Sequence, residues 1–421
     1  MTNLRNDYRR PTTTNQMLRG SIALAVVVAT GCVAPGEASF EGAAEDEVAA
    51  WMYDNPVAAT VGEDSIVGRL GLPTGRWYDL GPVEVAPPGA RAQNIQGGDK
   101  ANADRPEVSL PEGSFIRVDA HEQRQYLIEL TGEERADIGQ AMEALEMNVG
   151  TLGDRSDETA MALERATHKA VSGGVDTRIR RGVLDGYAID NWPYRVIGRT
   201  TSSCTGTMVG ENYYLTAAHC MFQEGTGAAI FAGLQPRRDG LIASYGTWDA
   251  VSFTYYTAYV ANNCHIDWVA HLCEKYDIAL VEVEEPWYVP TFTDHPGWMG
   301  FNYMHGSTLA GFSKWNRGYP SCGGTDAPAS CTSNTLYGDT NACSLGSFRQ
   351  PDGDGWNQLI DHGCDTNGGH SGSAVYLYDS GTATVIGVHI SGRSNSGSAT
   401  PNSMRRITPE WYSIMLSTMG L

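Results

Sequence analysis

The sequence predicts an all-β fold for the downstream part of this chain, with a region of different composition before it. After Arg195 the chain consists of short runs rich in β-branched and aromatic residues, separated by Gly, Asn, Asp and Pro. Strands joined by turns give this pattern in barrels and sandwiches. With 421 residues the chain also exceeds one average domain. The clearest runs are 213–215, 251–256, 278–283, 374–378 and 384–389.

Residues 1–32 are predicted to be an export signal. Four arginines precede the apolar run 21–29, and small residues follow it. This run is too short to cross a bilayer, so no transmembrane segment is expected and the protein should be secreted. Lipid anchoring through Cys32 is the alternative, although Ala29 stands where lipoprotein signals usually carry Leu or Val.

Residues 33–181 are predicted to be an acidic pro-region. Up to about Asn102 it is rich in Gly, Ala, Pro and acidic residues and has few apolar runs, which is typical of linker. Residues 115–130 are expected to form strands, and 133–149 and 157–171 show helical spacing. The prediction is a small α/β or partly disordered region.

The segment Arg178–Arg181 is a basic cluster in a chain short of positive charge. Cleavage here by an activating protease would release a mature protein, residues 182–421, that begins at Gly182 or Val183. The composition changes abruptly at this point, and every cysteine except Cys32 follows it. A solvated surface turn is the other interpretation of the cluster.

Charge and cysteine content narrow the choice of function. The net charge of -20 argues against nucleic acid as a partner, because phosphate binding needs a clustered basic surface. Of nine cysteines, Cys32 stands apart, and the remaining even set is expected to form four disulfides in an exported chain. The spacing does not suit zinc, so no metal is expected. Sequence neighbours suggest one connectivity, which the sequence alone does not fix: Cys204 with Cys220, Cys264 with Cys273, Cys322 with Cys331, and Cys343 with Cys364.

One helix is expected at the carboxyl end of the chain. Thr408 can cap its amino terminus, and Pro409 suits its first turn. Its apolar face would consist of Trp411, Ile414 and Met415. The all-β region is therefore expected to end in a helix.

Three motifs supply a nucleophile, a base and an acid in the downstream region. In chain order they are Thr-Ala-Ala-His-Cys around His219, Asp-Ile-Ala-Leu from Asp277, and Gly-Gly-His-Ser-Gly-Ser around Ser371. A serine hydroxyl is a poor nucleophile at neutral pH, so it needs a base that a third group orients. Ser371 would attack, His219 would take its proton, and Asp277 would orient the imidazole.

The glycines beside Ser371 allow the tight backbone turn that exposes a nucleophile. The same turn can aim the amides of Gly369 and Ser371 at one point. Two such donors would form an oxyanion hole for a tetrahedral intermediate. This chemistry requires no cofactor.

The order and flanking residues of His219, Asp277 and Ser371 resemble those of the chymotrypsin-like serine peptidases. The likeness covers Val183–Leu421. It implies two six-stranded antiparallel β-barrels, a Cys204–Cys220 disulfide, and an endopeptidase that acts on protein or peptide substrates through an acyl-enzyme. We expect a monomer. A catalytically inactive binding module and an esterase with the same triad are alternatives, since the fold does not fix the function.

Within that group, the segments 193–198, 365–369 and 387–389 resemble the glutamyl endopeptidases, which cut after acidic residues. The resemblance implies that Thr366 and His389 bind the substrate carboxylate, and His389 can acquire a proton as the anion enters. A strand histidine bonded to backbone is the plainer interpretation of His389. Asp365 stands where trypsin-like enzymes carry the aspartate that attracts Lys or Arg, so basic specificity is the alternative.

His370 stands where trypsin-like zymogens have the aspartate that captures the freed amino terminus. That activation switch is therefore not expected in this chain. In the glutamyl endopeptidases the new terminal amine instead helps to neutralise the substrate carboxylate. Gly182 or Val183 would supply this amine after a cut beside Arg181.

Overall fold

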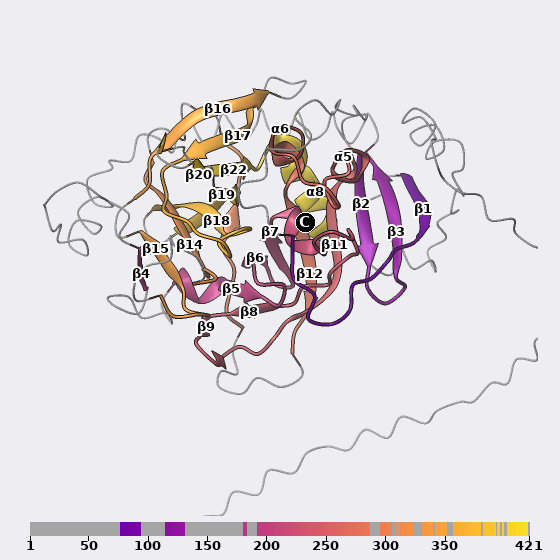
Figure 1. Cartoon of the computed structure of the whole chain (residues 1–421), viewed down its shortest axis with the longest axis horizontal. Coiled ribbons are helices and arrows are strands. Elements are labelled where there is room, and N and C mark those ends of the chain that lie inside the picture. The colour runs from indigo at the N-terminus through magenta and orange to yellow at the C-terminus, as the bar shows by residue number, and fades with distance from the viewer. Residues whose placement is uncertain are drawn as a thin grey trace, which may run out of the picture. The chain divides into compact units, whose positions relative to one another are not determined.

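The computed structural model describes residues 76–93, 114–130, 180–182, 192–286, 295–304, 306, 309, 312–322, 331–339, 342–351, 357–379, 382–392, 394–395, 398–399 and 402–419. They belong to one compact unit, residues 49–421 (Figure 1). The predicted signal, Cys32 and the helices expected at 133–149 and 157–171 lie outside the described residues. No helix in the described ranges is long and apolar enough to span a membrane.

The first sheet has nine strands in the order β1-β3-β2-β11-β12-β7-β6-β5-β8. Leu234 in β8 exchanges two backbone hydrogen bonds, of 2.9 and 2.8 Å, with Trp248, the residue before β11. The strands from β11 to β8 therefore form a set of six whose last member meets the start of its first. The bounds are β1 (Arg76–Pro82), β2 (Ser114–Asp119), β3 (Arg124–Glu129), β5 (Ile197–Thr200), β6 (Thr205–Gly210), β7 (Tyr213–Thr216), β8 (Leu234–Pro236), β11 (Asp249–Tyr256) and β12 (Ala279–Glu284).

The second sheet follows the order β16-β17-β22-β19-β18-β14-β15-β4, and β13 pairs with β19. The N–H of Cys343 donates to the carbonyl of Lys314 at 2.7 Å, which joins β14 to the chain just before β16. The bounds are β4 (Arg180–Gly182), β13 (Gly300–Phe301), β14 (Lys314–Gly318), β15 (Tyr337–Asp339), β16 (Leu345–Pro351), β17 (Asn357–His362), β18 (Ala374–Asp379), β19 (Thr382–Ser391) and β22 (Asn402–Arg406). The all-β prediction is confirmed, with the strands from β16 to β14 forming a second set of six.

The short elements lie between and after these strands. The terminal helix α8 is present as predicted. Thr408 caps it, since the N–H of Trp411 donates to Thr408 Oγ1 at 3.5 Å, and the predicted apolar face is buried. The bounds are η2 (Tyr194–Val196), η3 (Ala218–Met221), β9 (Arg238–Asp239), β10 (Ile242–Ala243), α5 (Thr257–Ala261), α6 (Ala270–Cys273), η4 (Glu274–Tyr276), β20 (Ser394–Asn395), β21 (Ser398–Ala399) and α8 (Pro409–Met419).

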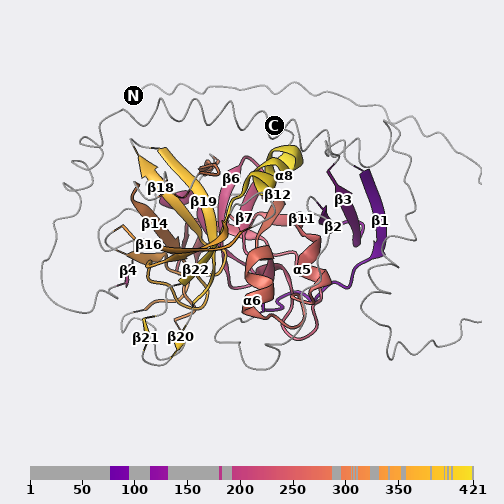
Figure 2. The same ribbon diagram turned by 90° about the horizontal axis from the view of Figure 1, so that it is seen from above.

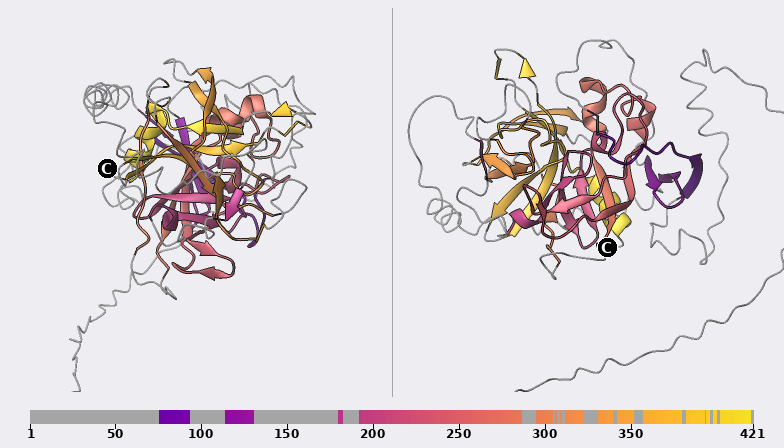
Figure 3. Two further views of the ribbon diagram at one scale, coloured as in Figure 1. Left: turned by 90° about the vertical axis from the view of Figure 1, so that its left-hand side faces the viewer. Right: turned by 60° about the horizontal axis from the view of Figure 1, so that its bottom comes forward.

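The strands predicted for residues 115–130 are β2 and β3, and they extend the first sheet instead of forming a sheet of their own. The turn between them is set locally: Asp119 Oδ1 accepts the N–H groups of His121 and Glu122 at 2.9 Å, and Gln123 has a positive φ of 52°. Figure 2 and the right panel of Figure 3 show β1 to β3, in indigo and purple, beyond β11 at the edge of this sheet.

Candidate active site

His219 lies in η3, directly after β7, and is held at two points by Asp277. Asp277 Oδ2 lies 2.7 Å from His219 Nδ1, and Asp277 Oδ1 accepts the backbone N–H of His219 at 2.8 Å. Both side chains are buried. The carboxylate fixes the ring so that Nδ1–H donates and Nε2 carries the lone pair. Nε2 has no hydrogen-bond partner within the described part of the chain.

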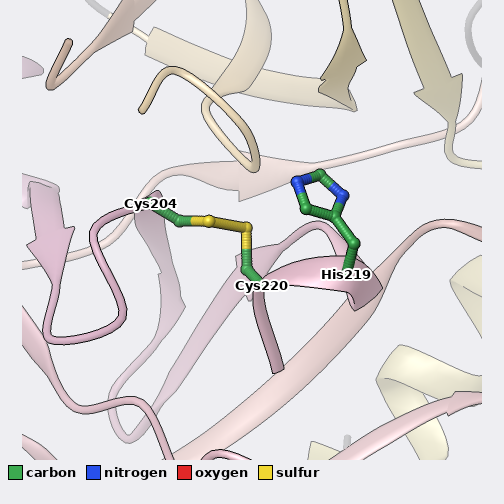
Figure 4. A group of neighbouring side chains, drawn as sticks. All are labelled: Cys204, His219 and Cys220. Carbon is green, nitrogen blue, oxygen red and sulfur yellow. A yellow bond between two sulfur atoms is a disulfide. The ribbon is translucent and has the colours of Figure 1, made fainter. Parts of the chain in front are cut away.

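Cys220, the next residue, forms a disulfide with Cys204 at the start of β6 (Figure 4). This bond ties the turn that carries His219 to the neighbouring strand. Ser371 approaches the same point, since its carbonyl oxygen lies 3.7 Å from Cys220 Sγ. The structure therefore brings residues 368–372 beside the turn that carries His219, called the histidine turn below. We call residues 368–372 the nucleophile turn, after the role predicted for Ser371.

All four disulfides join sequence neighbours. The pairs are Cys204–Cys220, Cys264–Cys273, Cys322–Cys331 and Cys343–Cys364. In the described ranges two groups have metal-like proximity, Cys204 with His219 and Cys220, and Asp339 with Cys343 and Cys364. Their sulfurs are bonded to each other, so they are not thiolate ligands.

The nucleophile turn requires glycine on both sides of Ser371. Gly369 has a φ of +94° and Gly372 a φ of +82°. A Cβ at Gly369 would overlap the carbonyl oxygen of Tyr319, and one at Gly372 would overlap Thr216 Oγ1. The turn packs closely against the first sheet, as the sequence prediction of a tight glycine turn anticipates.

The peptide between Gly368 and Gly369 has a fixed orientation. The carbonyl of Gly368 accepts the N–H of Ser321 at 2.7 Å. Because the carbonyl and N–H of a trans peptide point in opposite directions, the N–H of Gly369 faces away from Ser321. Among the described residues, no hydrogen bond uses the N–H of Gly369 or of Ser371. These two donors remain available to an oxyanion.

Thr205, which the sequence reasoning did not single out, anchors this turn. It is fully buried in β6, beside Cys204. Its N–H donates to the carbonyl of Ser371 at 2.9 Å, and its hydroxyl donates to the carbonyl of Gly369 at 2.7 Å. The same hydroxyl accepts the N–H of Tyr319 at 2.9 Å. One side chain of the first sheet therefore positions the turn of the second.

His389 lies in β19, and its ring contacts a second histidine, His362 in β17. His389 Nδ1 is 3.1 Å from His362 Nε2, and both rings are buried. Burial lowers the pKa of His362 to about 3, so this ring is neutral at neutral pH. The backbone of His389 bonds to the nucleophile turn, since its carbonyl accepts the N–H of Gly372 at 2.7 Å. His362 was missed because no motif surrounds it.

The other specificity candidates lie on the chain between Cys364 and Ser371. Asp365 and Thr366 are partly exposed, and the N–H of Asp365 donates to Asp339 Oδ2 at 2.8 Å. His370 is buried, and its Nδ1 accepts the N–H of Asn367 at 3.2 Å. The ring of His370 therefore bonds within its own turn.

A family model described as the trypsin-like peptidase domain matches residues 204–388. Over residues 204–388 the chain is therefore similar to the trypsin-like peptidases. The matched span includes the motifs of His219, Asp277 and Ser371. It leaves β1 to β5, β20 to β22 and the terminal helix outside the match.

Two curated relatives are similar over about half of the chain. The glutamyl endopeptidase of Bacillus licheniformis is 27% identical over 232 residues, which is 52% of this chain and 62% of that protein. A protein of Bacillus subtilis named extracellular metalloprotease is 26% identical over 215 residues, 50% of this chain and 59% of that protein. The chain thus spans about three fifths of the length of the curated relatives it matches.

Solved structures are similar at lower identity. A Glu endopeptidase in complex with MPD has a TM-score of 0.41 and 20% identity, covering 59% of this chain and 99% of that one. The protease Anisep from Arthrobacter nicotinovorans has a TM-score of 0.37 and 19% identity, covering 54% and 93%.

Proposed function

We propose that this chain is a serine endopeptidase whose catalytic residues are Ser371, His219 and Asp277. The observation that carries the proposal is the two-point contact between Asp277 and His219, which leaves Nε2 as the basic nitrogen. The two unused amides of the nucleophile turn support it. An inactive binding module would not need either feature.

The reaction follows from these groups. Ser371 Oγ attacks the scissile carbonyl carbon while His219 Nε2 takes the hydroxyl proton. The N–H groups of Gly369 and Ser371 stabilise the resulting oxyanion, each worth roughly 3 to 4 kcal/mol in the transition state. His219 then protonates the leaving amine as the C–N bond breaks. Water, deprotonated by His219, hydrolyses the acyl-enzyme and returns Ser371.

The preferred substrate is a peptide with Glu or Asp before the scissile bond. Thr366 would donate a hydroxyl hydrogen bond to the substrate carboxylate, and His389 would bind it as a cation. The neutral ring of His362 favours this cation, because its Nε2 can accept the proton on His389 Nδ1. The similarity to a glutamyl endopeptidase agrees with this preference. Cleavage after Lys or Arg, directed by Asp365, is the second candidate.

The protein would be made as an exported precursor, with a signal at 1–32 and a pro-region at 33–181, and act as a monomer. A cut beside Arg181 would free the amine of Gly182. In β4 Gly182 pairs with Tyr337, and Asp339 at the other end of the same β15 bonds to Asp365. The new terminus would start opposite Tyr337, two residues along β15 from the Asp339 that bonds to Asp365.

Two experiments test the proposal. A fluorophosphonate probe should label the processed protein on Ser371 and leave Ser371→Ala unlabelled, and an unlabelled native protein would support a binding module. A peptide-library profile should show cuts after Glu and Asp that His389→Ala abolishes. If His389→Ala still cut after Lys or Arg, the assigned acidic specificity would be wrong. Cleavage of esters without cleavage of peptides would indicate an esterase.

A further inference from the structure

Residues upstream of the basic cluster complete the edge of the first sheet. β2 pairs antiparallel with β11 along five residue pairs, from Ser252 with Asp119 to Tyr256 with Phe115. The N–H of Ala120 adds a hydrogen bond of 2.9 Å to the carbonyl of Val251. β3 and β1 continue the sheet outward. Without β2, this part of β11 would present unpaired backbone groups at a sheet edge.

The side chains of β2 are part of the core. All six residues of this strand are buried. The ring of Phe115 packs between two aromatic rings of the downstream chain, with centroids 5.0 Å from Tyr256 and 5.8 Å from Trp411 of α8. Ile116 and Val118 belong to the same buried cluster. Burial of this kind is typical of a permanent element, since each large apolar side chain contributes roughly 1.5 to 3 kcal/mol.

A partly buried ion pair joins the same strand to β12. Arg117 is almost fully buried, and its Nη2 lies 2.6 Å from Glu282 Oε2. Ser252 Oγ donates to the same carboxylate oxygen at 2.9 Å. If β2 left the sheet, Glu282 would lose its cationic partner. The pair therefore also favours retention of the strand.

The segment after β1 reaches the turn that carries His219. The N–H of Ala92 donates to the carbonyl of Ser202 at 3.2 Å, and the N–H of Gln93 donates to the carbonyl of Phe222 at 3.0 Å. Ser202 and Phe222 lie two residues outside the two ends of the Cys204–Cys220 bridge. Nearer β1, Ala86 and Glu84 exchange hydrogen bonds of 2.8 and 2.7 Å with Ala229. The segment thus braces both arms of the histidine turn.

We propose that residues 76–93 and 114–130 are a permanent part of the peptidase. A cut beside Arg181 then gives two chains that stay associated without a covalent link, and the upstream chain supports the histidine turn instead of blocking the site. This association does not depend on the proposed activity, because it rests on sheet pairing and burial alone.

The test separates the two pieces by an engineered cut. A recognition sequence for a site-specific protease is inserted between Gly173 and Gly174 of the full chain carrying Ser371→Ala, which prevents self-cleavage. After cutting, both pieces should co-elute on native size exclusion and separate only in denaturant. Phe115→Ala should raise the dissociation constant of the pieces roughly 100-fold or more. His121→Ala, at the exposed turn of the same hairpin, removes only a solvent-exposed contact of 3.7 Å with Glu284 and should change the constant by less than about threefold.

The brace is tested with Ser371 restored. The rate of phosphonate labelling should fall at least about 10-fold when the cut protein loses its upstream piece, and should recover when that piece is added back. Separation of the Ser371→Ala pieces under native conditions would overturn the retention. Faster labelling of Ser371 after loss of the upstream piece would show that this piece inhibits the site instead of supporting the histidine turn. If the downstream piece precipitates alone, the cut Phe115→Ala protein is used instead, because dilution should dissociate its two pieces and slow the labelling of Ser371. A labelling rate that does not change on dilution would contradict the proposal.

Discussion

Replacing Thr205 with valine should impair catalysis as well as lower the stability of the fold. The change removes the hydroxyl that donates to the carbonyl of Gly369 and accepts the N–H of Tyr319, while the bond from the Thr205 N–H to Ser371 remains. Two backbone groups lose their partner, at about 1 to 3 kcal/mol each, so the free energy of unfolding should fall by roughly 2 to 6 kcal/mol.

The catalytic effect comes from the position of the nucleophile turn. Gly369 supplies one donor of the proposed oxyanion hole, and loss of one such donor costs about 100-fold to 1,000-fold in kcat. Thr205→Val displaces this donor without deleting it, so we expect kcat to fall by roughly 10-fold to 100-fold with little change in KM. The assay is steady-state cleavage of a peptide with Glu before the scissile bond, alongside urea unfolding.

Thr207 gives a matched control on the same strand. It is fully buried, and its hydroxyl has no hydrogen-bond partner within the described chain. Thr207→Val therefore removes a hydroxyl of the same kind without breaking a bond, and should leave kcat unchanged and stability equal or higher. The reasoning would be refuted if Thr205→Val kept kcat within about twofold of the native protein, or if Thr207→Val lost as much.

Three further outcomes are expected. Arg349→Met removes the cation that lies 3.2 Å from Glu274, and should lower the free energy of unfolding in urea melts by about 2 to 4 kcal/mol. Adding Glu274→Gln should recover part of this loss. If the effects of the two substitutions were simply additive, the prediction would be contradicted. Because the pKa of His362 falls to about 3 on folding, the unfolded chain binds a proton that the folded chain does not, and stability should drop by about 1.4 kcal/mol per pH unit below about pH 6.5. His362→Gln should flatten that slope between pH 6 and pH 4, and an equal slope would count against it. Alanine at residues 178–181 should block processing yet leave Ser371 reactive toward a phosphonate, since the amides of the turn are already unused in the uncut chain.

The sequence could predict what short-range patterns encode. Alternating β-branched and aromatic residues marked the strands, Thr408 and Pro409 marked the last helix, and neighbouring cysteines marked the disulfides. The motif around His219 and the one around Asp277 also anticipated a contact between residues 58 positions apart. In each case the signal lies in a few adjacent residues.

Contacts that depend on the register of distant strands were not predictable in this way. Thr205 has no motif, and its role exists only because β6 packs against the nucleophile turn. His362 meets His389 because β22 lies between β17 and β19 and brings both rings to one face. The pairing of β2 with β11 joins segments more than a hundred residues apart, and no local pattern specifies that partner.

The predicted cut beside Arg181 should affect substrate binding and not the arrangement of the nucleophile turn. The uncut chain already has the His219–Asp277 contact and the two unused amides, and His370 bonds within its own turn, so the nucleophile does not wait for a new terminus. The cut would instead act through Gly182, which pairs with Tyr337 on β15, two residues from the Asp339 that bonds to Asp365. Processing should therefore lower KM for substrates with an acidic residue before the scissile bond and leave the labelling rate of Ser371 nearly constant. A rise in labelling rate with no change in KM would place activation at the nucleophile turn instead.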